Sequence, residues 1–72
     1  MAAVLRKKVG LRIAQIRALK GVSQAELASH IGISRSYLGG IERGEKDIAL
    51  SVFALICRRL EASPNDLLSL GV

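Results

Sequence analysis

The sequence predicts an all-α fold in which five helices form one compact domain spanning residues 1–72. Apolar residues recur at spacings of three and four, the period of a helix, and no strand-like alternation is sustained. Serines that cap helices and glycines that end them separate the apolar segments. Aromatic residues, which are common in strands, are limited to Tyr37 and Phe53. A chain of 72 residues is long enough for one domain and too short for two.

The first helix is expected from about Val4 to Lys20. Its inner face is predicted from apolar residues that recur every three or four positions: Leu5, Val9, Ile13, Ile16 and Leu19. Gly21 follows this segment, and glycine is the residue that most often ends a helix.

The second and third helices are short and follow one another closely. Ser23 is a good N-cap for the second helix, because Glu26 three residues later completes a capping box, and Gly32 ends this helix. Ser34 is the expected N-cap of the third helix, which stops at Gly44. The inner faces of the two helices are predicted to hold Leu27, Ala28, Ile31, Leu38 and Ile41.

The last two helices complete the predicted domain. The fourth is expected from about Leu50 to Leu60, although Ala49 is a poor N-cap. Its inner face is predicted to hold Phe53, Ile56, Cys57 and Leu60. The fifth begins at Ser63 and Pro64, an N-cap followed by proline at the first helical position. Its leucines, Leu67, Leu68 and Leu70, either close the core of a monomer or make residues 63–70 a dimerisation helix.

The chain is basic, with a formal net charge of +5. The first 20 residues contain six lysines and arginines and no acidic residue. This balance favours a polyanionic partner, with nucleic acid ahead of an anionic membrane surface. The run from Arg6 to Lys8 has two interpretations: a solvated helix face, or a contact to a nucleic-acid backbone.

Several classes of protein are excluded by composition. Cys57 is the single cysteine and His30 the single histidine, so neither an intrachain disulfide nor a Cys/His metal site is expected. No apolar run approaches the roughly 20 residues that span a bilayer, and no secretory hydrophobic segment is seen. The sequence offers no paired carboxylates, Ser/His/Asp set or phosphate loop for catalysis. We therefore expect a cytoplasmic protein that is not an enzyme and that carries no cofactor, metal or small-molecule ligand.

Residues 24–42 carry the pattern of two helices joined by a tight turn at residues 32–34. Ala28 is small where the two helices would cross, and Gly32 suits a left-handed turn. The surrounding apolar positions fix the angle between the helices. The outer face of the third helix is then left available to enter a groove of DNA.

Three segments of this region, Ser23–Ala28, Gly32–Leu38 and Ile41–Gly44, resemble the Cro/C1-type (XRE-like, lambda-repressor-like) helix-turn-helix family of phage repressors and bacterial regulators. The resemblance extends from about Val9 to Leu70. The segment Glu42–Leu50 is further similar to the controller proteins of restriction–modification systems.

The resemblance implies a nucleoid-associated bacterial or phage transcriptional regulator with a helix-turn-helix core at residues 23–44. Such a regulator binds double-stranded DNA as a homodimer on a two-fold symmetric operator, and no membrane is involved. Leu67, Leu68 and Leu70 are then the predicted dimer interface. An antitoxin or adaptor-type protein-interaction module of the same fold is the alternative.

Individual roles also follow from the resemblance. Gln24 is expected to contact a phosphate, while Arg35 and Ser36 read base edges in the major groove. Tyr37 and Arg43 are expected to contact the backbone or flanking bases, although Tyr37 has packing as its alternative role and Ser36 a place in the first turn of the helix. The full set of candidate DNA-binding residues is Gln24, Ser34, Arg35, Ser36, Tyr37, Gly40, Arg43 and Lys46. Arg17 and Glu42 match a structural ion pair between the first and third helices.

Two glycines in the third helix depart from the family pattern. Relatives often carry polar side chains where this chain has Gly39 and Gly40. Each glycine costs roughly 1 kcal/mol relative to alanine in a helix interior, so packing must hold this helix in place. Arg35 is therefore expected to carry more of the specificity. Arginine just after an N-cap gains nothing from the helix dipole, and its presence there indicates an anionic partner.

Overall fold

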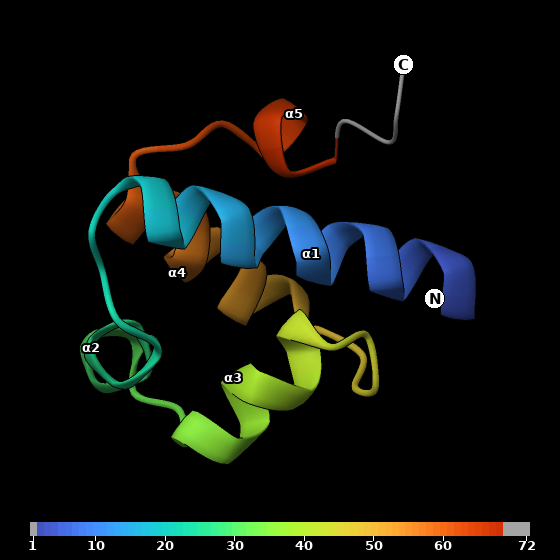
Figure 1. The fold of residues 1–72 in the computed structure, drawn as a ribbon, viewed down its shortest axis with the longest axis horizontal. Coiled ribbons are helices and arrows are strands. Elements are labelled where there is room, and N and C mark those ends of the chain that lie inside the picture. Colours follow the sequence, from blue (N-terminus) through green and yellow to red (C-terminus); the bar gives the residue numbers. More distant parts are fainter. Residues whose placement is uncertain (1, 69–72) are drawn as a thin grey trace.

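The computed structural model describes residues 2–68 and has the predicted all-α architecture. Its five helices are α1 (Ala3–Leu19), α2 (Gln24–Ile31), α3 (Arg35–Glu42), α4 (Leu50–Leu60) and α5 (Pro64–Leu67) (Figure 1). The prediction for Leu70 lies outside the described residues. None of the helices in residues 2–68 combines the length and the apolarity that crossing a bilayer requires.

The long helix α1 holds the other elements together. It contacts α3 and α5, which lie on opposite sides of it in Figure 1. Helix α2 contacts both α3 and α4, and α4 also contacts α5. The short pair α2–α3 is therefore supported by α1 and α4.

Side-chain caps fix where three of the helices begin. Ser23 Oγ accepts a hydrogen bond from the Glu26 N–H, and the Glu26 carboxylate accepts one from the Ser23 N–H (3.0 and 3.1 Å). Ser63 and Asp66 form the same reciprocal pair at α5 (3.2 and 3.0 Å). Ser34 Oγ accepts from the Tyr37 N–H at the start of α3 (3.0 Å). Each cap satisfies a backbone donor that has no partner within the helix.

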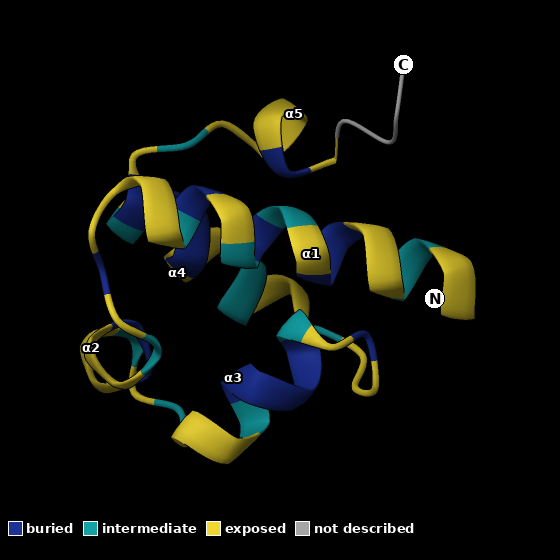
Figure 2. Ribbon diagram, in the orientation of Figure 1, coloured by how far each residue is buried: buried dark blue, intermediate teal, exposed yellow. Residues whose placement is uncertain are grey.

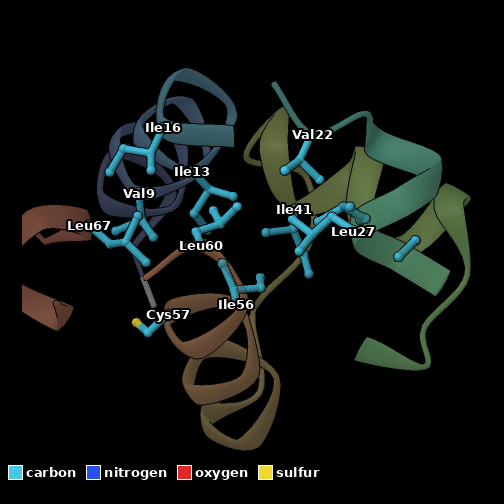
Figure 3. Packing of buried hydrophobic residues seen from close by; sticks show 12 residues of the cluster. Val9, Ile13, Ile16, Val22, Leu27, Ile41, Ile56, Cys57, Leu60 and Leu67 are labelled. Carbon is cyan, nitrogen blue, oxygen red and sulfur yellow. The ribbon is translucent and has the colours of Figure 1, made fainter. Parts of the chain in front are cut away.

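The core is formed by the faces that the helices turn toward one another (Figure 2). Among the described residues its buried side chains are all apolar: Val9, Ile13, Ile16, Val22, Leu27, Ala28, Leu38, Ile41, Ile56, Cys57, Leu60 and Leu67. Figure 3 shows Leu67 of α5 and Val9 of α1 meeting in this core. Leu67 is fully buried within the monomer, so it is not available to a dimer surface.

Leu19 is a correction to the predicted inner face of α1. Its side chain is 83% exposed, and Val22, beyond the helix end, takes a place in the core. Successive residues of a helix are rotated by about 100°. The six residues from Ile13 to Leu19 therefore fall about 120° short of two full helix turns. The Leu19 side chain points away from the face that Ile13 occupies by that angle.

Helices α1 and α3 cross closely at Gly10. A Cβ atom at this position would collide with the carbonyl oxygen of Ile41 and would lie 2.8 Å from that of Glu42. Gly10 is itself buried. The glycine therefore lets the backbone of α3 rest directly on α1, a contact that the sequence analysis did not identify.

Candidate DNA interface

The turn between α2 and α3 has the conformation that its sequence predicts. Gly32 has φ +77°, in the left-handed region that glycine adopts without steric cost. The Ile33 N–H donates to the carbonyl oxygen of Ala28 (3.0 Å), and Ala28 is buried beneath the turn. Figure 2 shows the result: the first turn of α3 is exposed, while its second half is buried.

An ion pair ties α3 to α1. Arg17 Nε lies 2.7 Å from Glu42 Oε2, and Arg17 Nη2 lies 3.0 Å from Glu42 Oε1, so the guanidinium binds the carboxylate through two bonds. Arg17 Nη1 also donates to the carbonyl oxygen of Val22 (2.9 Å). The hydrogen bond to Glu42 raises the pKa of Arg17, so its guanidinium is charged at any physiological pH. Only 17% of the Arg17 side chain and 7% of the Glu42 side chain are exposed.

Gln24 connects this ion pair to the exposed start of α3. Its Nε2 donates to Glu42 Oε1 (3.0 Å), and its Oε1 accepts a long hydrogen bond from Arg35 Nε (3.4 Å). A chain of hydrogen bonds thus runs from α1 to the side chain expected to read bases. The phosphate contact expected of Gln24 stays a prediction, and its place in this series of hydrogen bonds was not evident from the sequence.

The first turn of α3 presents three candidate residues. Arg35 and Ser36 are exposed. Tyr37 is half-buried and packs against the core, and its hydroxyl donates to the carbonyl oxygen of Asp47 (3.1 Å). Tyr37 therefore has a packing role. Part of its side chain stays exposed, and it follows the exposed Ser36 in the sequence.

Two side chains from the segment after α3 cover the two glycines of this helix. A Cβ atom at Gly39 would lie 3.0 Å from Arg43 Nη1, and a Cβ atom at Gly40 would lie 2.6 Å from Lys46 Cγ. Arg43 Nε donates to Glu45 Oε1 (3.1 Å). The positions that lack side chains are thus occupied by cationic side chains from the loop.

Arg6 has a structural role that the sequence analysis missed. Its Nε donates to the carbonyl oxygen of Gly44 and its Nη1 to Asp47 Oδ1, both at 3.3 Å. The hydrogen bond from Arg6 lowers the pKa of Asp47. These bonds fasten the loop after α3 to the start of α1. Asp47 was the signal that the loop needs a cationic partner, but that partner, Arg6, lies far away in the sequence.

An apolar hollow lies on the side of the molecule formed by α1, α4 and the segment around α5. Its volume is about 190 Å³, and it is lined by Val9, Ile48, Leu50, Phe53 and Leu68. Leu50 at its edge is 82% exposed, and Leu68 is partly exposed. Of the three leucines predicted for a dimer interface, only Leu68 borders this hollow within the described residues.

The tight turn between α2 and α3, with the first turn of α3 exposed, defines a class of protein: a DNA-binding transcriptional regulator of the helix-turn-helix type. A family model described as helix-turn-helix matches residues 13–67, and the chain belongs to this family, in its Cro/C1-type branch. Relatives include two control proteins. The chain is 35% identical to C.BamHI of Bacillus amyloliquefaciens, over 89% of this chain and 80% of that one. It is 34% identical to C.SmaI of Serratia marcescens over 74% of this chain, but spans only 63% of that relative's length.

Solved structures share the same fold. The clp gene regulator ClgR from C. glutamicum superposes with a TM-score of 0.87, is 38% identical, and is matched over 90% of this chain and 83% of that chain. The restriction–modification controller protein C.AhdI from Aeromonas hydrophila gives a TM-score of 0.82 at 37% identity, over 86% of this chain and 94% of that one.

Proposed function

We propose that the protein recognises a two-fold symmetric DNA operator as a homodimer and regulates transcription as a restriction–modification controller protein. The observation that carries this proposal is Arg35, an exposed arginine at the start of α3 that makes one long hydrogen bond to Gln24 (3.4 Å). Arginine binds O6 and N7 of guanine through two parallel hydrogen bonds, which discriminate against other bases by about 1–3 kcal/mol. Neighbouring Ser34, Ser36 and Tyr37 complete the proposed reading surface at the start of α3.

Phosphate contacts are proposed to set the register of the protein on the duplex. The N-termini of α2 and α3 offer backbone N–H groups, and Gln24 lies at the start of α2. Lys46 adds positive charge beside α3, close to the backbone of Gly40. This contribution is independent of sequence and weakens as salt concentration rises.

The homodimer is proposed to form around the apolar hollow. One helix-turn-helix unit buries too little surface on a half-site for tight specific binding, whereas two units meet half-sites about 34 Å apart. The exposed Leu50 and Leu68, beside Phe53, form the apolar surface that a second copy would cover. Residues 63–70, predicted as a dimerisation helix, would contribute to this surface through Leu68.

The controller assignment is supported by the similarity to C.BamHI, C.SmaI and C.AhdI. ClgR, with a TM-score of 0.87 against 0.82 for C.AhdI, is more similar in fold and is described as a clp gene regulator. A controller is expected to bind DNA within the restriction–modification locus that encodes it. Binding confined to sites outside such a locus would favour a regulator of other genes.

The test is selection of bound sequences from a random DNA pool, together with the mass of the protein in solution. A two-fold symmetric consensus and a dimer mass are expected. No enriched sequence would contradict the proposal and leave only the salt-dependent attraction of a basic surface. The apolar hollow would then become the place to seek a protein partner, as in an antitoxin or adaptor.

A further inference from the structure

A second arginine lies along the same side of α3 as Arg35. Arg35, Gly39 and Arg43 are spaced by four residues, which places them in one row on the helix surface. Arg43 is the C-cap residue, and its Nη1 lies 3.0 Å from the point where a Cβ atom of Gly39 would be. A side chain at position 39 would therefore press on the guanidinium of Arg43 and shift it by a few tenths of an ångström.

Two other side chains border this space. Glu45 Oε1 accepts the hydrogen bond from Arg43 Nε (3.1 Å), and this bond leaves the two terminal nitrogens of the guanidinium available to a ligand. The Gln24 amide lies on another side, with its Oε1 3.6 Å from the same Cβ point of Gly39. Gln24 thus hydrogen-bonds to Arg35, four residues before Gly39 along the chain. Glu45 hydrogen-bonds to Arg43, four residues after Gly39.

The pair formed by Arg43 and Glu45 has little value for stability. Both side chains are about 60% exposed, at 60% and 61%, and exposed ion pairs contribute little to folding. The carboxylate does affect which ligand Arg43 meets. An anionic group beside the guanidinium repels a phosphate more than it repels the neutral edge of a base.

We infer that Arg43 is a second specificity-determining residue, and that Gly39 and Glu45 position its guanidinium to read a guanine. This inference rests on the proposed DNA-binding function. Although Arg35 and Arg43 are eight residues apart, the Arg43 guanidinium lies over Gly39, which is four residues, or about 6 Å along the helix, from Arg35. The two side chains are therefore placed to read neighbouring base pairs of one half-site. Gly39, which has no side chain, lets the Arg43 guanidinium lie against the surface of α3.

The inference is tested by comparing selected DNA sequences for wild type, Gly39→Ala, Arg43→Lys and the double variant. Lysine keeps the charge but loses the two-bond geometry. We expect Arg43→Lys to lose guanine preference at one base pair by roughly 5- to 150-fold, and Gly39→Ala to lose a smaller part of the preference at the same base pair, with the preference read by Arg35 retained. The double variant should lose no more than Arg43→Lys alone, because Gly39 acts through Arg43.

Glu45→Gln adds an independent readout. Removing its negative charge should strengthen binding to random duplex and reduce the preference at the Arg43 base pair. Ser51→Ala on the exposed surface of α4 is the control for a change in helix propensity alone, and its selected sequences should equal those of wild type.

The outcomes separate this inference from the proposed function. If wild type selects no sequence, the regulator proposal fails and this inference fails with it. A wild-type consensus that Gly39→Ala leaves unchanged at every position overturns the inference alone. Losses that add in the double variant would also overturn it, because Gly39 would then act independently of Arg43.

Discussion

Glu42 accepts hydrogen bonds from Arg17 and from Gln24, and it is the most buried charged side chain of this network. We expect Glu42→Ala to lower the free energy of unfolding by about 3–5 kcal/mol, because it leaves the largely buried charge of Arg17 without a partner. Thermal and guanidinium unfolding measure this loss. Glu45→Ala is the matched control, since it removes a carboxylate that is 61% exposed and should cost less than about 1 kcal/mol. Equal stability of the two variants would contradict the assigned role of Glu42.

The opposite behaviour is expected of Arg35, because it is exposed and is proposed to contribute to DNA binding rather than to folding. Arg35→Ala is expected to lose about 1–3 kcal/mol of discrimination at one base pair and to unfold at the wild-type temperature. Arg58→Ala, which removes an exposed charge from α4, controls for the general loss of positive charge. Titrations against operator and random duplex separate the two effects. An unchanged operator preference would remove Arg35 from the reading surface.

The capping boxes of α2 and α5 each contain a carboxylate, Glu26 and Asp66, so the stability of the fold depends on pH in the acidic range. The pKa of Glu26 is lowered, first by the Ser23 backbone N–H and then by its hydroxyl, and the pKa of Asp66 is lowered in the same way by Ser63. Folded-state pKa values below the ordinary 4.5 and 3.8 mean that these caps stabilise the fold above that range. The stabilisation is lost as pH falls through the folded-state values.

We therefore expect the unfolding temperature to fall as the pH is lowered from about 5 to 3. In the double variant Glu26→Gln and Asp66→Asn, amide oxygens still accept the hydrogen bonds but do not titrate, so the fall should be shallower. Unfolding curves recorded at several pH values make the comparison. A slope identical to that of wild type would show that the capping carboxylates do not contribute to it.

A substitution at the C-cap of α4 is expected to raise the free energy of unfolding. Glu61 has φ +53°, a left-handed conformation that costs a residue with a Cβ about 1 kcal/mol. Glu61→Gly should raise the free energy of unfolding by up to about that amount, since glycine is the preferred residue there. Glu61→Ala is the control, because it keeps the Cβ and should give no gain. Chemical denaturation that ranks alanine above glycine would contradict the argument.

Elements were predictable from sequence to the extent that their signals are local. Ser23, Ser34 and Ser63 fixed three helix starts because an N-cap bonds to the backbone only two or three residues away. Leu19 was misplaced because spacing alone does not show how far a face has rotated by the helix end. The contact at Gly10 and the link through Gln24 depend on how helices cross. No short stretch of sequence contains that information.

At the scale of the whole molecule, a small domain leaves apolar surface uncovered beside a core that is otherwise closed. Leu67 completes the core, whereas Leu50 and Leu68 lie around the hollow on the same side of the molecule. A two-fold dimer places the same patch of both copies in contact. The proposed dimer surface therefore offers a test that does not disturb the proposed reading surface on α3.

Leu50→Glu should shift the mass in solution toward monomer, because each two-fold contact would then bring two buried carboxylates together. The fold should persist, since Leu50 is 82% exposed in the monomer. Leu19→Glu is the matched control: this leucine is 83% exposed on α1 and does not line the hollow. Sedimentation over a range of concentrations gives the dimer constant, and operator titration should weaken in parallel. A dimer constant that Leu50→Glu leaves unchanged would place the interface elsewhere, and a wild-type monomer at every concentration would remove the homodimer from the proposed function.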